Sequence, residues 1–101
     1  MNETPTVSNI TYEDVAGYLR LDDDLTTDEI KTLNNLIAIA RQYIRSWTGL
    51  TDEKIDEYTD FVIVVYILCQ DMWDNRALYV DKSNLNHVVS SILDMHSVNL
   101  L

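Results

Sequence analysis

Residues 26–49 read TTDEIKTLNNLIAIARQYIRSWTG, and they carry the strongest folding signal in the chain. Thr26 and Glu29 have the spacing of a capping box, in which each side chain accepts a hydrogen bond from the other residue's free backbone N–H at the start of a helix. Apolar side chains then recur within an arc of about 140°, as an amphipathic helix requires; they are Ile30, Leu33, Leu36, Ile37, Ala40, Tyr43, Ile44 and Trp47. Gly49 supplies a C-terminal stop. The stretch therefore predicts a long helix over 27–48.

Three further helices are predicted around this one. Thr11 and Asp14 mark a helix start, and the apolar spacing predicts a helix over about 12–20. A third helix is expected to begin between residues 52 and 58 and to continue to about residue 78. Its β-branched centre, 62–67, resembles a buried strand, but the helical period extends far beyond strand length. Ser83 is expected to cap a last helix with several residues on one side, namely Leu85, Val88, Val89, Ile92 and His96.

The expected fold class is all-α, a small bundle of about four helices with a long central helix and short loops. The chain has 101 residues, near the usual size of one domain, and contains only two Gly and one Pro. Residues 11–101 are predicted to form a single helical domain. Residues 1–10, with Pro5 and several Thr, Ser and Asn, are expected to be a flexible lead-in.

The charge balance excludes several classes of function. Seventeen Asp and Glu against seven Lys and Arg give a net charge of -10, so the chain is a poor phosphate binder and is repelled by an anionic membrane surface. The longest apolar run, 61–69, is less than half of a membrane span. Cys69 is the single cysteine, and the first ten residues do not resemble a secretory signal. A soluble protein of a reducing interior is expected.

No group of residues has the spacing of a catalytic, cofactor or metal site. The series Asp22, Asp24, Thr26, Asp28 begins like a calcium loop, but Thr27 and Leu33 stand where that loop needs Gly and Glu. His87 and His96 are too far apart for zinc, Cys69 lies on an apolar helix face, and Asp71 and Asp74 have no accompanying motif. The chain is expected not to be an enzyme.

Two features of the third predicted helix indicate contacts. Arg76 projects at the angle of the buried residues, so it is expected to face the interior and to pair there with a carboxylate or helix-end carbonyls, or with another subunit. Ile63, Val64 and Ile67 lie on the opposite side, among aspartates. Either the other helices of the bundle cover these three residues, or they form an apolar patch that a partner covers.

The cations of the long helix form a third candidate contact. Lys31, Arg41 and Arg45 fall within about 80° of one another on the predicted helix. This cationic stripe is expected either to be a solvated helix face or to meet the acids of 52–60 on a neighbouring copy. Such a contact joins two different surfaces, as closure of a ring requires.

Several short motifs, in order, resemble the small head-tail connector (adaptor) proteins of tailed phages and prophages. They are Asp14-Val15, Tyr18-Leu19-Arg20-Leu21-Asp22 with its acidic loop, Ile37-Ala38 through Ala40, Tyr43-Ile44, Thr48-Gly49 and Asp74-Asn75-Arg76. The resemblance covers roughly residues 12–80; the segment 85–101 departs from it. It implies a virion protein, assembled in the host cytoplasm, that forms a ring of about a dozen copies below the portal. The ring extends the DNA channel and joins the head to tail or stopper proteins.

Because such a family has no catalytic residues, the resemblance implies contact regions only. These are Asp22, Asp23 and Asp24 in the acidic loop, and Asp74, Asn75 and Arg76 at the helix end. An acidic channel lining repels phosphate, so DNA is expected to pass without specific binding. The alternative is an acidic helical inhibitor that mimics DNA, which requires rows of exposed carboxylates; here many carboxylates stand at helix starts and loops instead.

Overall fold

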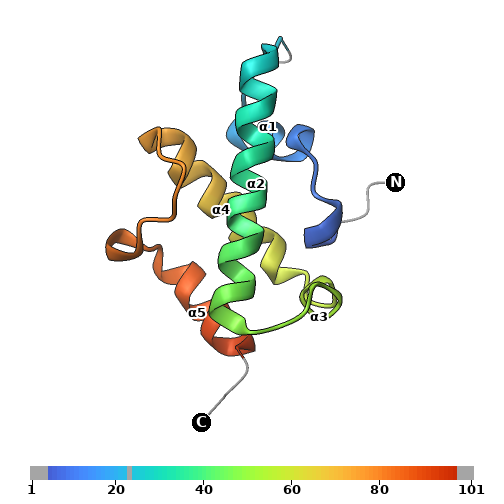
Figure 1. Ribbon diagram of the computed structural model, residues 1–101, viewed down its shortest axis with the longest axis vertical. Coiled ribbons are helices and arrows are strands. Elements are labelled where there is room, and N and C mark those ends of the chain that lie inside the picture. Colours follow the sequence, from blue (N-terminus) through green and yellow to red (C-terminus); the bar gives the residue numbers. More distant parts are fainter. Residues whose placement is uncertain (1–4, 23, 98–101) are drawn as a thin grey trace.

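The computed structural model describes residues 5–22 and 24–97, and within these ranges the fold is all-α with no strand. The elements are η1 (Val7–Asn9), α1 (Tyr12–Leu19), α2 (Thr27–Thr48), α3 (Asp52–Asp56), α4 (Asp60–Asn75), η2 (Lys82–Asn84) and α5 (His87–His96). The long helix α2 runs through the middle, crossed by α4, with the other elements around them (Figure 1). The predicted fold class, a small helical bundle with a long central helix, is confirmed.

The first two predicted helices form as expected, because local capping interactions define their ends. At α2, Glu29 N donates to Thr26 Oγ1 and Thr26 N donates to Glu29 Oε1, which completes the capping box. Gly49 ends the helix in the left-handed conformation, with φ of 73°. The Thr11–Asp14 pair caps α1 in the same way. The helix boundaries in this half of the chain therefore follow from the sequence alone.

The prediction of a single helix from the 52–58 region to residue 78 is wrong. Residues 57–59 are not helical and separate two helices, α3 and α4. Ile55 and Phe61 are both buried. On one continuous helix these side chains would project about 120° apart, so only one of them would face the core. The break reorients α3 and lets both side chains reach it. Residue 76 then ends α4 earlier than predicted.

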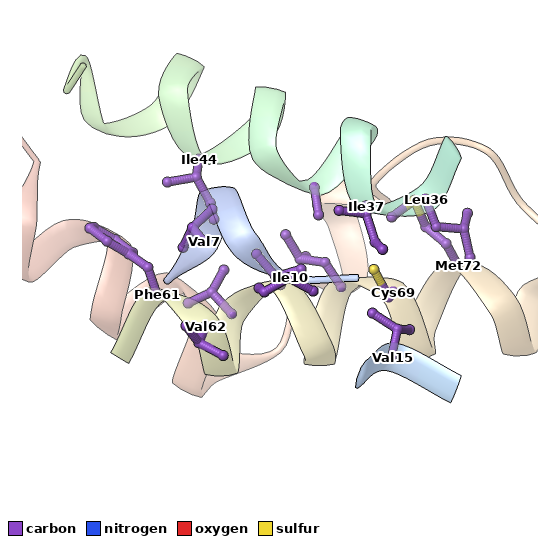
Figure 2. Packing of buried hydrophobic residues seen from close by; sticks show 14 of the residues in the cluster. Val7, Ile10, Val15, Leu36, Ile37, Ile44, Phe61, Val62, Cys69 and Met72 are labelled. Carbon is purple, nitrogen blue, oxygen red and sulfur yellow. The ribbon is translucent and has the colours of Figure 1, made fainter. Parts of the chain in front are cut away.

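The prediction that residues 1–10 are a flexible lead-in is wrong for residues 7–10. Val7 and Ile10 are buried in the same core as α2 and α4 (Figure 2). The segment is polar overall, but burial of these two apolar side chains stabilises its contact with the bundle. The folded domain therefore includes η1, while residues 1–4 lie outside the described ranges.

The last helix begins later than predicted. Ser83 belongs to η2, where its backbone N–H and hydroxyl both donate to the carboxylate of Asp81. Asn86 is the actual cap of α5, since its Oδ1 accepts from Val88 N. The packing of α5 against the bundle buries Val89 and Leu93, whereas Val88, which was predicted to share the inward side, is 51% exposed.

Aromatic and polar contacts hold α5 against the rest of the bundle. His96 stacks on Tyr58 with ring centroids 4.1 Å apart, and its Nε2 lies 2.9 Å from Asp60 Oδ2. Trp47 Nε1 donates to Asp94 Oδ1 over 2.9 Å. His96 is partly packed and His87 is exposed. These contacts join the end of α5 to both α2 and the start of α4.

Candidate functional site

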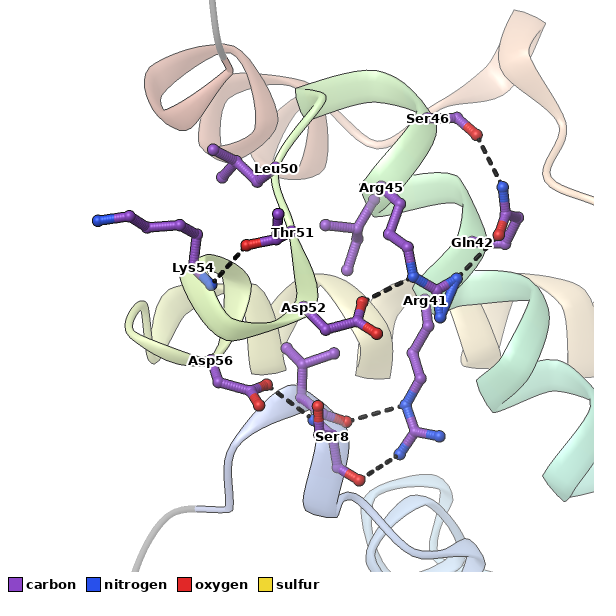
Figure 3. Close-up of polar contacts among 12 residues, drawn as sticks. Ser8, Arg41, Gln42, Arg45, Ser46, Leu50, Thr51, Asp52, Lys54 and Asp56 are labelled. Carbon is purple, nitrogen blue, oxygen red and sulfur yellow. Dashed lines mark hydrogen bonds and ion pairs between the residues drawn. The ribbon is translucent and has the colours of Figure 1, made fainter.

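Two of the three cations of the stripe, for which a solvated face and a contact with a neighbouring copy were the two readings, are engaged within their own chain (Figure 3). Arg41 Nε donates to Val7 O over 2.9 Å, and its Nη2 donates to Ser8 O and Ile10 O over 3.1 Å each. Its guanidinium thus holds η1 against α2. The cause is that residues 7–10 fold back along α2, which helix periodicity does not reveal.

Arg45 also has an internal partner. Its Nε lies 2.7 Å from Asp52 Oδ1, and its Nη1 donates to Gln42 Oε1 over 2.8 Å. Asp52, one of the acids of 52–60, therefore pairs with Arg45 in the same protomer. Lys31 remains exposed and forms no ion pair within the described ranges. Among the described residues, Lys31 is therefore the member of the predicted cationic stripe for which no ion pair is found.

The apolar trio predicted on the far side of α4 separates into different environments. Val64 is fully buried and belongs to the core, Ile67 is partly buried, and Ile63 is 48% exposed. Tyr18 of α1, also exposed, stacks on Tyr66 of α4 with ring centroids 5.0 Å apart. The bundle's own packing covers Val64, so the exposed apolar surface here is formed by Ile63, Ile67 and the Tyr18–Tyr66 pair.

Arg76 is exposed, which corrects the prediction that it faces the interior. It adopts the left-handed conformation, with φ of 53°, and so ends α4 instead of continuing its rotation. Its guanidinium carbon lies 5.1 Å from the Trp73 ring centroid, within the range of a cation–π contact. Asp74 and Asn75 beside it are exposed, and Asn75 Nδ2 donates to Asp71 O.

The acidic loop remains at the surface. Asp22 and Asp24 are exposed, whereas Asp23 lies outside the described residues. Within the described ranges, no three His, Cys, Asp or Glu side chains gather closely enough to hold a metal ion. These same ranges contain no helix that is long and apolar enough to cross a bilayer.

An apolar groove beside α2 is a feature that the sequence did not reveal. One wall is the outer flank of α2 and the other is the segment that follows α4, which passes beside α2 before η2 (Figure 1). The groove has a volume of about 660 Å³. Its lining is Ala38, Ile39, Gln42, Tyr43, Ser46, Trp47, Leu78, Tyr79, Val80 and Lys82. We call this surface the α2 groove.

Large apolar side chains remain uncovered at this groove. Leu78 is 60% exposed and Tyr79 is 65% exposed. The hydroxyl of Tyr43 is buried and has no hydrogen-bond partner in the described part of the chain, and burial raises the pKa of Tyr43 above the ordinary tyrosine value. The sequence signal was present: Leu78-Tyr79-Val80 is an apolar run outside any helix that would bury it. Because large exposed apolar surfaces are often covered by a partner, we treat the α2 groove as a candidate contact surface.

Cys69 is a core thiol, as predicted, and we expect it to be unreactive in the folded protein. Burial raises its pKa to about 12, and the positive charge of Arg41 opposes this only in part. The thiolate fraction at pH 8 is then about a thousandfold below that of a free cysteine. Labelling with a disulfide reagent is expected to be at least that much slower in buffer than in guanidinium chloride. Comparable rates in both solvents would contradict the burial.

The same shift predicts a loss of stability in alkali. Because the folded-state pKa of Cys69 lies above the unfolded value of 9.0, folding favours the neutral thiol. The stabilisation is complete below pH 9 and falls as pH rises from there towards 12. Cys69→Ala is expected to reduce this alkaline slope.

Comparisons with protein-family models, with curated proteins and with solved structures give no significant match.

Proposed function

We infer that this chain is a structural subunit of the head-tail connector (adaptor) class, which assembles into a ring below a phage portal and surrounds DNA without holding it. The observation that carries the proposal is the distribution of charge and apolar surface. Arg41, Arg45 and Lys54 are engaged by carbonyls or carboxylates of their own chain. The protomer therefore offers an acidic surface together with exposed apolar faces. Such a subunit is suited to self-association around a channel that repels phosphate.

The state of the carboxylates favours a connector over a DNA mimic. Asp14 and Glu29 are caps, Asp52 pairs with Arg45, Asp56 accepts from Ser8 N, and Asp60 contacts His96. These acids serve the fold at separate places on the surface. A mimic needs free carboxylates in rows that replace successive phosphates of a duplex.

Electron microscopy of the protein mixed with the portal of its own phage or prophage tests the proposal. We expect an added ring of density below the portal, and its absence would overturn the proposed function. In fluorescence anisotropy, affinity for duplex DNA is expected to be weaker than about 10⁻⁴ M at physiological salt. A protein that instead competes with DNA for a basic partner would support the mimic.

A further inference from the structure

The two exposed apolar surfaces differ in shape and in charge. The α2 groove is concave and carries Lys82 in its lining, and an adjoining hollow that shares Leu78 contains Arg76. The second surface is the outward side of α4, defined by Ile63, Ile67 and Asp74 and here called the α4 stripe. Helical spacing places these residues in one row. One surface is therefore a hollow with Lys82 in its lining and Arg76 in the adjoining hollow. The other is a helix face that carries the exposed Ile63, the partly exposed Ile67, the polar Gln70 and the acid Asp74.

The charged side chains on both surfaces have no oppositely charged partner among the described residues, and the Arg76 guanidinium lies over the Trp73 ring. Among the described residues, Arg76 and Lys82 form no ion pair, and Asp74 forms none either. Because the chain has a net charge of -10, two copies repel one another in most orientations. An orientation that places the acid of one copy against the cations of another replaces repulsion with attraction.

The lengths of the two surfaces also agree. At 1.5 Å per residue, Ile63 to Asp74 spans about 16 Å. The α2 side of the groove, from Ala38 to Trp47, spans about 14 Å, and the adjoining hollow extends it to Thr32. Small side chains at Ala38 and Ser46 leave room for the branched side chains of an incoming helix.

We propose that the α4 stripe of one copy docks in the α2 groove of the next. Ile63 and Ile67 enter the apolar groove, and Asp74 meets Lys82 at its rim. Because groove and stripe are different surfaces, each copy offers one of each, and the contact is head-to-tail. Repeated, this contact joins copies in a row. That the row closes into a ring rests on the proposed function.

Cysteine cross-linking tests this contact directly. The double variant Ile63→Cys with Ala38→Cys places a thiol on each surface, while the native Cys69 is buried. Oxidation is expected to give a ladder of covalent oligomers. A mixture of the two single variants is expected to give cross-linked pairs between them and no longer ladder. The matched control is Val88→Cys with Ala38→Cys, since Val88 is equally exposed but lies on α5.

Exchanging the charges of Lys82 and Asp74 tests whether these two side chains pair at the edge of the groove. Lys82→Glu in the double-cysteine background is expected to lower the yield of the ladder about tenfold. Adding Asp74→Lys is expected to restore it, whereas Lys31→Glu, an exposed reversal outside the groove, is expected to have no such effect. A ladder no more abundant than that of the Val88 control, or one unaffected by Lys82→Glu, would overturn this contact.

The connector function and the head-to-tail contact can be tested independently. If the protein adds a ring to the portal but the ladder does not form, the connector function stands and the contact described here is wrong. If the ladder forms with the expected charge dependence but no density appears below the portal, the head-to-tail contact stands and the connector function is wrong.

Discussion

Replacing Val64 by aspartate is expected to unfold the protein, whereas the same replacement at the adjacent Ile63 is expected to leave it folded. Val64 is fully buried between the helices and Ile63 is 48% exposed. A carboxylate at position 64 has no partner in an apolar core, so it must ionise without solvent or stay protonated at a cost in free energy. We expect Val64→Asp to lower the free energy of unfolding by more than about 4 kcal/mol, a large part of the stability of a small domain.

Urea denaturation followed by circular dichroism measures this difference. Ile63→Asp is expected to change the free energy of unfolding by less than about 0.5 kcal/mol, as is usual for exposed positions. The pair is matched in chemistry and adjacent in sequence, so helix propensity does not separate the two results. Similar losses at both positions would mean that the outward side of α4 is covered within the protomer, and that it is not an exposed contact surface.

Replacing Arg41 by methionine is expected to release the N-terminal segment from the bundle. The substitution keeps most of the aliphatic side chain but removes three hydrogen bonds from the guanidinium to backbone carbonyls of residues 7, 8 and 10. Hydrogen bonds that involve a charged group stabilise more than neutral ones. Loss of the contact also loosens Val7 and Ile10, which are buried. The expected loss is about 3 kcal/mol in the free energy of unfolding.

The control for Arg41→Met is Arg45→Met, on the same helix. Arg45 pairs with Asp52, whose side chain is 61% exposed, and a pair so open to solvent is expected to contribute less than about 1 kcal/mol. Hydrogen exchange at residues 7–11 is expected to accelerate only in Arg41→Met. A loss below about 1 kcal/mol in that variant would contradict the role of Arg41 as the anchor of this segment.

Because Arg41 anchors the N-terminal segment, charge reversal on α2 is not a clean test of oligomer assembly. If the cationic stripe met a neighbouring copy, charge reversal at Arg41 and Arg45 would weaken oligomers. In the structure, reversal at Arg41 would place a carboxylate beside three carbonyl oxygens of its own chain. Weaker assembly of such a variant would then follow from damage to the protomer. Lys82 and Asp74, which are exposed, are the appropriate positions for a test of association.

Elements defined by neighbouring residues were predictable from the sequence. The bounds of α2, its capping box and its Gly49 stop depend on residues at most four apart along the chain. The burial of Cys69 and Leu33 followed from helical spacing, because each lies near the middle of an apolar arc. The acidic loop was also placed correctly at the surface as far as it is described, at Asp22 and Asp24.

The contact residues were harder to predict, because periodicity assigns a side to each residue but not a neighbour. Ile63 and Val64 looked alike in the sequence, and only the packing of the other helices buries one and exposes the other. Arg41 looked like a surface cation until the segment 7–10 folded against it. The α2 groove arises between α2 and residues 78–82, which are more than 30 positions from that helix along the chain.

The sequence by itself therefore determined an acidic, all-α chain with a capped central helix, since hydrogen bonds and capping contacts within a few residues establish these features. The tertiary structure decided the break between α3 and α4, the engagement of Arg41 and Arg45 within the protomer, and the groove and stripe left uncovered. The physical reason is that burial and charge pairing depend on distances through space. Those distances are established only when segments that are far apart in the sequence pack into the same core.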